Sequence, residues 1–227
     1  MIIRNTILFS ILFFSFSSLQ ANPFKKNREQ LDAKIIEAQA RLSALQADPK
    51  KAIPPVILSS ARGIIILRQL KAGLGFGAEA GGGVALIRRP DGVWSPPAFV
   101  NMAHASWGVQ IGAQDKDIVM VLMTEKGLDL LKEGKRGDVG VEYQATVGPV
   151  NVGADLDTNN LSPILIYSTA TGGFAGIALK GGGIVGAKNK NKTYYGMTLQ
   201  QVLFSGKAPM SGSSANLIKS IQEFSSR

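Results

Sequence analysis

Two glycine-rich segments raise the question of nucleotide binding, because closely spaced glycines let backbone amides approach a phosphate. Residues 71–83 (KAGLGFGAEAGGG) contain Gly73-x-Gly75-x-x-Ala78, which approximates the dinucleotide-binding fingerprint. That fingerprint needs a helix directly after it, and three successive glycines disfavour one. Residues 181–188 end in Gly-Ala-Lys and lack the Gly-Lys-Ser/Thr ending of a P-loop. We therefore expect no nucleotide and no other cofactor.

Side chains that bind metals or act in hydrolysis are scarce. Residues 155–160 (DLDTNN) start like an EF-hand loop, but its sixth and twelfth positions are Asn160 and Ile166, where glycine and glutamate are needed. The chain has no cysteine and a single histidine, His104, which excludes the usual zinc sites. No Gly-x-Ser-x-Gly nucleophile accompanies His104. We predict a protein that is not an enzyme and has neither catalytic nor metal-binding residues; a lipid- or glycan-acting hydrolase using His104 is the least favoured alternative.

The N-terminal residues 1–21 have the features of a cleaved signal peptide. Arg4 supplies a positive charge, and Ala21 suits a cleavage site. The apolar run at residues 7–16 is shorter than the roughly 20 residues that span a bilayer, although a membrane anchor is the alternative. The sequence predicts export, to the periplasm or the medium, with the protein peripheral to an envelope membrane. The absence of cysteine excludes disulfides and an N-terminal lipid anchor.

The net charge of +9 favours an anionic partner. Outside the cytoplasm this is more often a lipid or a glycan than nucleic acid, so we expect no nucleic-acid partner. Basic side chains contribute about 1 kcal/mol each near an anionic lipid surface, although each can equally be a solvated charge. The candidate lipid-binding residues lie on the N-terminal helix and around the first strand: Lys34, Arg41, Lys50, Lys51, Arg62, Arg68 and Lys71.

The clearest predicted element is a helix over residues 28–46, ended by Asp48-Pro49. Apolar residues recur there at spacings of three and four, which gathers them on one face: Leu31, Ile35, Ala38, Leu42 and Leu45. This face either inserts at the headgroup boundary of a membrane or packs on a sheet. The sequence leaves both readings open.

The rest of the chain indicates glycine-containing strands with short helices. Strands are predicted at residues 63–67, 84–87, 118–123, 139–147, 164–167 and 174–179, and helices at 56–62, 125–133 (capped by Thr124), 197–204 and 215–224. The glycine triplets at 81–83 and 181–183 have similar contexts, which predicts tight connections or bulges. The expected fold is α+β: a largely antiparallel, glycine-rich sheet, open or closed into a barrel, with an N-terminal amphipathic helix and a few short helices.

The order of these motifs resembles the SYLF domain from about Asp48 to Gly196. The matching segments are residues 55–67 (PVILSSARGIIIL), 71–84, 90–97 (PDGVWSPP), 110–112 with 118–122, 145–150 (ATVGPV), Tyr167 with 173–179, and 191–196 (NKTYYG). Eukaryotic SYLF domains bind phosphoinositides and phospholipids, some fungal members bind actin, and the N-terminal amphipathic helix of the family engages membranes. The resemblance therefore implies lipid binding, and residues 28–46 occupy the place of that helix.

These observations divide the chain into a signal peptide (1–21), an N-terminal amphipathic helix (22–47), a SYLF-like domain (48–204) and a C-terminal linker with a helix (205–227). We expect non-enzymatic binding of anionic phospholipid or a membrane surface in the bacterial envelope. Unlike eukaryotic members, the sequence shows a leader and no SH3 or FYVE module, so actin is not an expected partner and phosphoinositide specificity is not carried over. The alternative is a structural or protein-interaction module of the envelope without lipid specificity.

Overall fold

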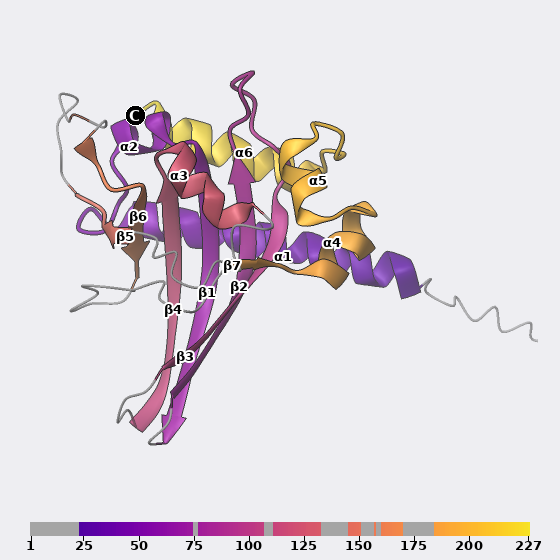
Figure 1. Cartoon of the computed structure of the whole chain (residues 1–227), viewed down its shortest axis with the longest axis horizontal. Helices are drawn as coiled ribbons and strands as arrows, with labels where there is room; N and C mark the ends of the chain where they lie inside the picture. The colour runs from indigo at the N-terminus through magenta and orange to yellow at the C-terminus, as the bar shows by residue number, and fades with distance from the viewer. Residues whose placement is uncertain are drawn as a thin grey trace, which may run out of the picture.

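The described strands form one open, seven-stranded sheet, shown in the computed structural model of the chain (Figure 1). The structure describes residues 23–74, 77–106, 111–132, 145–150, 157, 160–169 and 184–227. The sheet order is β5-β6-β4-β1-β2-β3-β7. The strands are β1 (Gly63–Leu74), β2 (Gly77–Ile87), β3 (Ala98–Ser106), β4 (Ile111–Leu122), β5 (Ala145–Val147), β6 (Ile164–Ser168) and β7 (Ile184–Gly186).

All neighbouring strands are antiparallel except β5 and β6, which are parallel. Together with the helices, this arrangement confirms the predicted α+β class with a largely antiparallel sheet. The described strands do not close into a barrel, because β5 and β7 lie at opposite edges.

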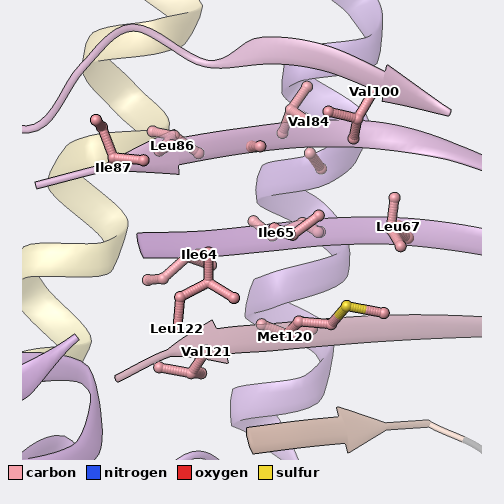
Figure 2. Packing of buried hydrophobic residues seen from close by; sticks show 14 of the residues in the cluster. Ile64, Ile65, Leu67, Val84, Leu86, Ile87, Val100, Met120, Val121 and Leu122 are labelled. Carbon is pink, nitrogen blue, oxygen red and sulfur yellow. The ribbon is translucent and has the colours of Figure 1, made fainter. Parts of the chain in front are cut away.

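The central strand β1 is buried on both faces in its first half, which explains its unbroken apolar sequence. Successive side chains of a strand point to opposite faces, so a strand covered on both sides needs apolar residues at every position. Residues Ile64 to Leu67 are at most 1% exposed. Figure 2 shows Ile64, Ile65 and Leu67 between residues of β2 and β4, where Ile65 pairs with Ala85 and Met120.

The helix α1 (Pro23–Ala47) lies across one face of the sheet, beside α6 (Gly212–Ser225) (Figures 1 and 2). Its predicted apolar stripe, from Leu31 to Leu45, is 0–8% exposed. The apolar stripe therefore packs on the sheet, which is one of the two alternatives that the sequence left open. The lower parts of β1 to β4 extend past α1 in Figure 1.

The opposite face of the sheet carries shorter helices: α3 (Glu125–Leu128), η1 (Asp129–Leu131) and α5 (Leu199–Phe204). Their starts follow capping rules. Thr124 Oγ1 accepts a hydrogen bond from the Gly127 amide, as predicted, and Thr198 with Gln201 forms a capping box before α5. The helices α2 (Pro55–Ser60) and α6 are close to their predicted bounds, whereas α4 (Lys188–Tyr195) was not predicted.

The first glycine triplet lies inside the continuous strand β2, so the prediction of a tight connection or bulge is wrong there. β1 also runs seven residues beyond its predicted end, because it pairs with β2 and β4 along its whole length. The signal peptide, the second triplet, residues 174–179 and most of the EF-hand-like loop lie outside the described residues. Within the described part of the chain, no helix has both the length and the apolar character to span a bilayer.

Candidate functional site

A groove with a volume of about 330 Å³ lies between α1 and the sheet. One flank of α1 forms a wall, the strands β1 to β3 form the floor, and α4 contributes Lys190. Three of the predicted lipid-binding residues line it, namely Lys34, Arg41 and Arg68. Its apolar part includes Leu70 of β1, which is 54% exposed. The groove therefore combines cationic side chains with accessible apolar surface.

The glycine triplet of β2 forms part of the groove floor. A Cβ on Gly83 would lie 1.8 Å from the Ile66 carbonyl oxygen, and one on Gly81 would lie 2.9 Å from the Arg68 carbonyl oxygen. These two glycines let the backbones of β1 and β2 approach closely. A Cβ on Gly82 would instead lie 3.7 Å from Asn101 Oδ1 and 3.8 Å from Lys190 Nζ. A Cβ at Gly82 would thus make only ordinary contacts, and its absence leaves the floor of the groove lower beside Lys190.

Both arginines of the groove are paired with carboxylates. Arg41 donates to Asp117 at 2.8 Å and to Glu37 at 3.3 Å. Arg68 makes a two-pronged contact with Asp115, and this hydrogen bonding lowers the pKa of Asp115. Burial is the main reason that the pKa of Asp117 is raised. The positive charge of these arginines is therefore largely compensated within the protein.

The two lysines of the groove have no such compensation. Within the described residues, neither Lys34 nor Lys190 has a carboxylate within ion-pair distance. Lys190 Nζ donates to Asn101 Oδ1 at 3.3 Å. Burial, and then the nearby charge of Lys34, lower the pKa of Lys190. Two like charges thus share one groove, which favours an anionic ligand there.

The position of Lys190 is fixed by how α4 is attached to β3. Asn191 is fully buried; its Oδ1 accepts from the Phe99 amide and its Nδ2 donates to the Phe99 carbonyl, both at 2.8 Å. The Tyr195 hydroxyl donates to the Pro97 carbonyl at 2.8 Å. Because Asn191 is anchored to β3 in this way, its neighbour Lys190 is held beside Asn101 of the same strand.

A second set of hydrogen bonds fixes α1 relative to α4 and α6. Asp32 of α1 accepts from the Tyr194 hydroxyl and from the Ser213 hydroxyl, each at 2.5 Å. Gln39 of α1 also donates to Ser220 of α6 at 2.9 Å. The wall of the groove therefore depends on the last third of the chain.

The other predicted site residues lie outside the lining of this groove. Lys50 is exposed, and Lys51 donates to the Thr169 carbonyl at 2.7 Å. Arg62 pairs with Glu125 at 2.8 Å. Lys71 lies in β1, and its side chain is outside the description. Arg62 and Lys71 are nine positions apart along extended chain, a distance of about 30 Å, so the basic residues around the first strand do not form one compact site.

Sequence reasoning missed Lys190 and its partner Asn101. Residues 188–192 (KNKNK) have the composition of a solvated charged loop, and no local pattern relates them to α1. The available signal was the spacing of Asn191, Tyr194 and Tyr195, all of which are buried on one side of α4. That spacing predicts a helix, but it does not predict which strand the helix contacts.

The described residues add no support to the catalytic and metal-binding alternatives. His104 lies in β3 opposite Glu79 of β2, but its side chain is outside the description, so the hydrolase alternative is untested. Among the described residues, no group of three or more acidic or histidine side chains is placed to hold a metal ion. The Asn160 amide donates to Asp157 at 2.6 Å.

Comparison with known proteins identifies the family. The Ysc84 family model, described as "Las17-binding protein actin regulator", matches residues 103–224, more than half of the chain. The chain belongs to this family, which is that of the SYLF domain, as its motifs indicated. The match begins within β3 and includes β4 to β7, α3 to α5, η1 and most of α6.

The chain is also similar to several curated proteins. It is 31% identical to the SH3 domain-containing YSC84-like protein 1 of Xenopus laevis, over 75% of this chain and 51% of that protein. The Rattus norvegicus protein of the same name is 27% identical, over 89% of this chain and 60% of that protein. Protein YSC84 of Saccharomyces cerevisiae is 33% identical, over 63% of this chain and 32% of that protein.

The chain thus spans between half and three fifths of the length of the vertebrate relatives it matches. The names of the family and its members describe binding and regulatory proteins. No solved structure matches the chain.

Proposed function

We propose that the chain is a non-enzymatic module that binds anionic phospholipid at a membrane surface. The observation that carries this proposal is the groove, whose lining includes the exposed side chain of Leu70 and two lysines that have no carboxylate partner among the described residues. Cationic groups next to accessible apolar surface match the two parts of a phospholipid, its headgroup and its acyl chains.

Further basic residues lie on the two helices that carry these lysines and that contact one another. The exposed ones are Lys26 and Arg28 of α1, and Lys188 and Lys192 of α4. We call these exposed residues and the groove the α1–α4 surface, and we propose that a membrane contacts them. The apolar stripe of α1 is packed on the sheet, so the proposed contact uses this surface and not insertion of the stripe.

Co-sedimentation with vesicles tests the proposal. We expect the protein to bind vesicles of phosphatidylcholine with phosphatidylglycerol, and to bind vesicles of phosphatidylcholine alone much more weakly. Equal or negligible binding to both kinds of vesicle would refute the proposal.

Two matched charge reversals then locate the contact. One variant combines Lys188→Glu with Lys192→Glu, and the other combines Lys50→Glu with Arg62→Glu, so both change the net charge equally. At about 1 kcal/mol for each lysine removed, the first should weaken binding about 30-fold or more. A larger loss in the second variant would move the contact to the residues around the first strand.

The cellular setting belongs to the same proposal. The expected signal peptide over residues 1–21 supports export to the periplasm or the medium, with the protein peripheral to an envelope membrane. The mass of the protein purified from its producing cells tests this setting. We expect the mass of a chain that has been cleaved after Ala21. An intact N-terminus in a membrane fraction would favour the anchor instead.

Protein binding is the second candidate, because the family description names Las17 binding and actin regulation. A pull-down that recovers a stoichiometric protein partner, from a preparation without bound lipid, would favour this candidate. The expectation that actin is not a partner is tested by co-sedimentation with actin filaments.

A further inference from the structure

We propose that Lys34 and Lys190 bind a phosphate group over the backbone of Gly82. This inference rests on the proposed lipid-binding function for its biological setting, but its physical basis is the groove itself. Lys34 approaches from α1 and Lys190 from α4, and both side chains line the groove whose floor contains Gly82. The two residues are 156 positions apart, so the fold alone brings them together.

The charge balance of the groove favours an anionic ligand. Its four cations are Lys34, Arg41, Arg68 and Lys190. The carboxylates around it are already engaged: Glu37 and Asp117 by Arg41, and Asp115 by Arg68. Among the described residues, the four cations exceed these three carboxylates by one, and the two lysines are the cations without a carboxylate within ion-pair distance.

Placing the positive charges of Lys34 and Lys190 in one groove is unfavourable without an anion. Lys190 is partly buried, and burial and the charge of Lys34 both disfavour its protonated form. An anion between the two ammonium groups would replace their repulsion with attraction, and hydrogen bonds between ionised groups are among the strongest in proteins. An anionic ligand would therefore stabilise this pair of like charges.

The groove also provides room for a ligand at Gly82 and a neutral hydrogen-bond donor at Asn101. Gly82 has no side chain, and the position of its absent Cβ lies 3.8 Å from Lys190 Nζ. Asn101 accepts from Lys190 through Oδ1, which leaves its amide NH₂ without a partner among the described residues. A phosphate oxygen is an acceptor for such a donor. Two ammonium groups and one amide beside a position without a side chain make a site for a tetrahedral dianion.

The source of the phosphate is a lipid headgroup or a free phosphate, and the groove volume of about 330 Å³ accommodates either. The exposed side chain of Leu70 in the same groove favours the lipid, because its apolar surface suits the acyl chains next to the headgroup.

The experiment compares the wild-type protein with Lys34→Gln, Lys190→Gln and their combination. The matched control combines Lys126→Gln with Lys207→Gln, which removes two exposed charges that are not part of the groove lining. Inorganic phosphate is titrated in a calorimeter, and vesicles of phosphatidylcholine with phosphatidic acid, a phosphate monoester, are co-sedimented. Each single groove variant should weaken binding about tenfold, as expected for a charge-assisted hydrogen bond, while the control stays within about twofold.

The variant with arginine at both groove positions preserves the charge and should retain binding, which separates loss of charge from loss of folding. As an independent readout, Lys34→Gln should raise the pKa of Lys190 in side-chain NMR, because it removes a neighbouring positive charge. An unchanged pKa would show that the two lysines do not share a site.

The outcomes separate this inference from the proposed function. Phosphate binding that depends on the two lysines, without vesicle binding, supports the site with free phosphate as the source and refutes the membrane function. Vesicle binding that is insensitive to Lys34→Gln and Lys190→Gln, with no phosphate binding, keeps the membrane function and overturns the site. Dependence on the lysines in both arms identifies a lipid headgroup.

Discussion

At the scale of single residues, the glycine triplet of β2 has two different roles. Gly81 and Gly83 lie where a Cβ would meet the backbone of β1, whereas the Cβ position of Gly82 is toward Asn101 and Lys190. Because side chains alternate along a strand, neighbouring glycines serve opposite faces of the sheet. Two of them permit close strand pairing and the third shapes the groove.

This difference predicts opposite outcomes for two neighbouring substitutions. Gly83→Ala places a methyl group 1.8 Å from the Ile66 carbonyl oxygen, so β1 and β2 must separate. The expected loss is about 3 kcal/mol or more in the free energy of unfolding, measured with urea. Gly82→Ala makes ordinary contacts at 3.7 Å and should change stability by less than about 0.5 kcal/mol. Equal stabilities of the two variants would contradict this account.

The sequence predicted that these glycines were architectural, but it could not assign their roles. Three adjacent glycines have no side-chain pattern from which to read a face or a register, so a bulge and a regular strand look alike. Lys190 was missed for a related reason, since Lys34, which lines the same groove, is on a helix that is distant in sequence. Individual basic residues are visible in a sequence, whereas charge compensation between them is a property of the fold.

At the scale of elements, helices with an apolar stripe were predictable and those without one were not. α1 was predicted from its period of 3.6, and its stripe is the buried face. α4 has only three buried residues in eight, and side-chain hydrogen bonds attach it to Phe99 of β3 and to Pro97 just before that strand. The strand β1 was predicted only where it is apolar, because its second half depends on pairing with β2 and β4.

The contact between α1, α4 and α6 predicts a dependence on pH. Burial alone would raise the pKa of Asp32, but hydrogen bonds from Ser213, Tyr194 and Ser211, and the charge of Arg28, outweigh it and lower the pKa. Because the pKa of Asp32 is lower in the folded protein, its charge stabilises the fold at pH values above the pKa in the unfolded chain, about 3.9. This stabilisation is lost as the pH falls through the pKa of the folded protein.

Asp32→Asn tests this dependence, because asparagine can still accept from both hydroxyls. The variant should be less stable by about 1 kcal/mol at neutral pH, a modest value because Asp32 is partly exposed. The difference from wild type should shrink below about pH 4, where the carboxylate becomes protonated. Urea unfolding across this pH range measures it, and a difference that is independent of pH would show that Asp32 does not carry its charge into this contact.

At the scale of the whole molecule, the two ends of the described chain pack against each other. α6 contacts α1 and α2, and its inner face, with Leu217, Ile221 and Phe224, is at most 9% exposed. The family match also ends at residue 224, the position of the last of these buried side chains. The division into a domain over residues 48–204 and a C-terminal linker and helix remains a prediction, and the packing allows a sharp test of it.

If α6 belongs to the same cooperative core, a cavity within it must weaken the whole fold. Ile221→Ala truncates a fully buried side chain and should lower the free energy of unfolding by about 2–5 kcal/mol. The exposed neighbour provides the control, and Gln222→Ala should cost less than about 0.5 kcal/mol. Urea unfolding followed by tryptophan fluorescence and by circular dichroism should give one transition at a lower midpoint with an unchanged slope. A separate early transition in circular dichroism alone would instead make α6 an independent unit, which would support the predicted boundary near residue 205.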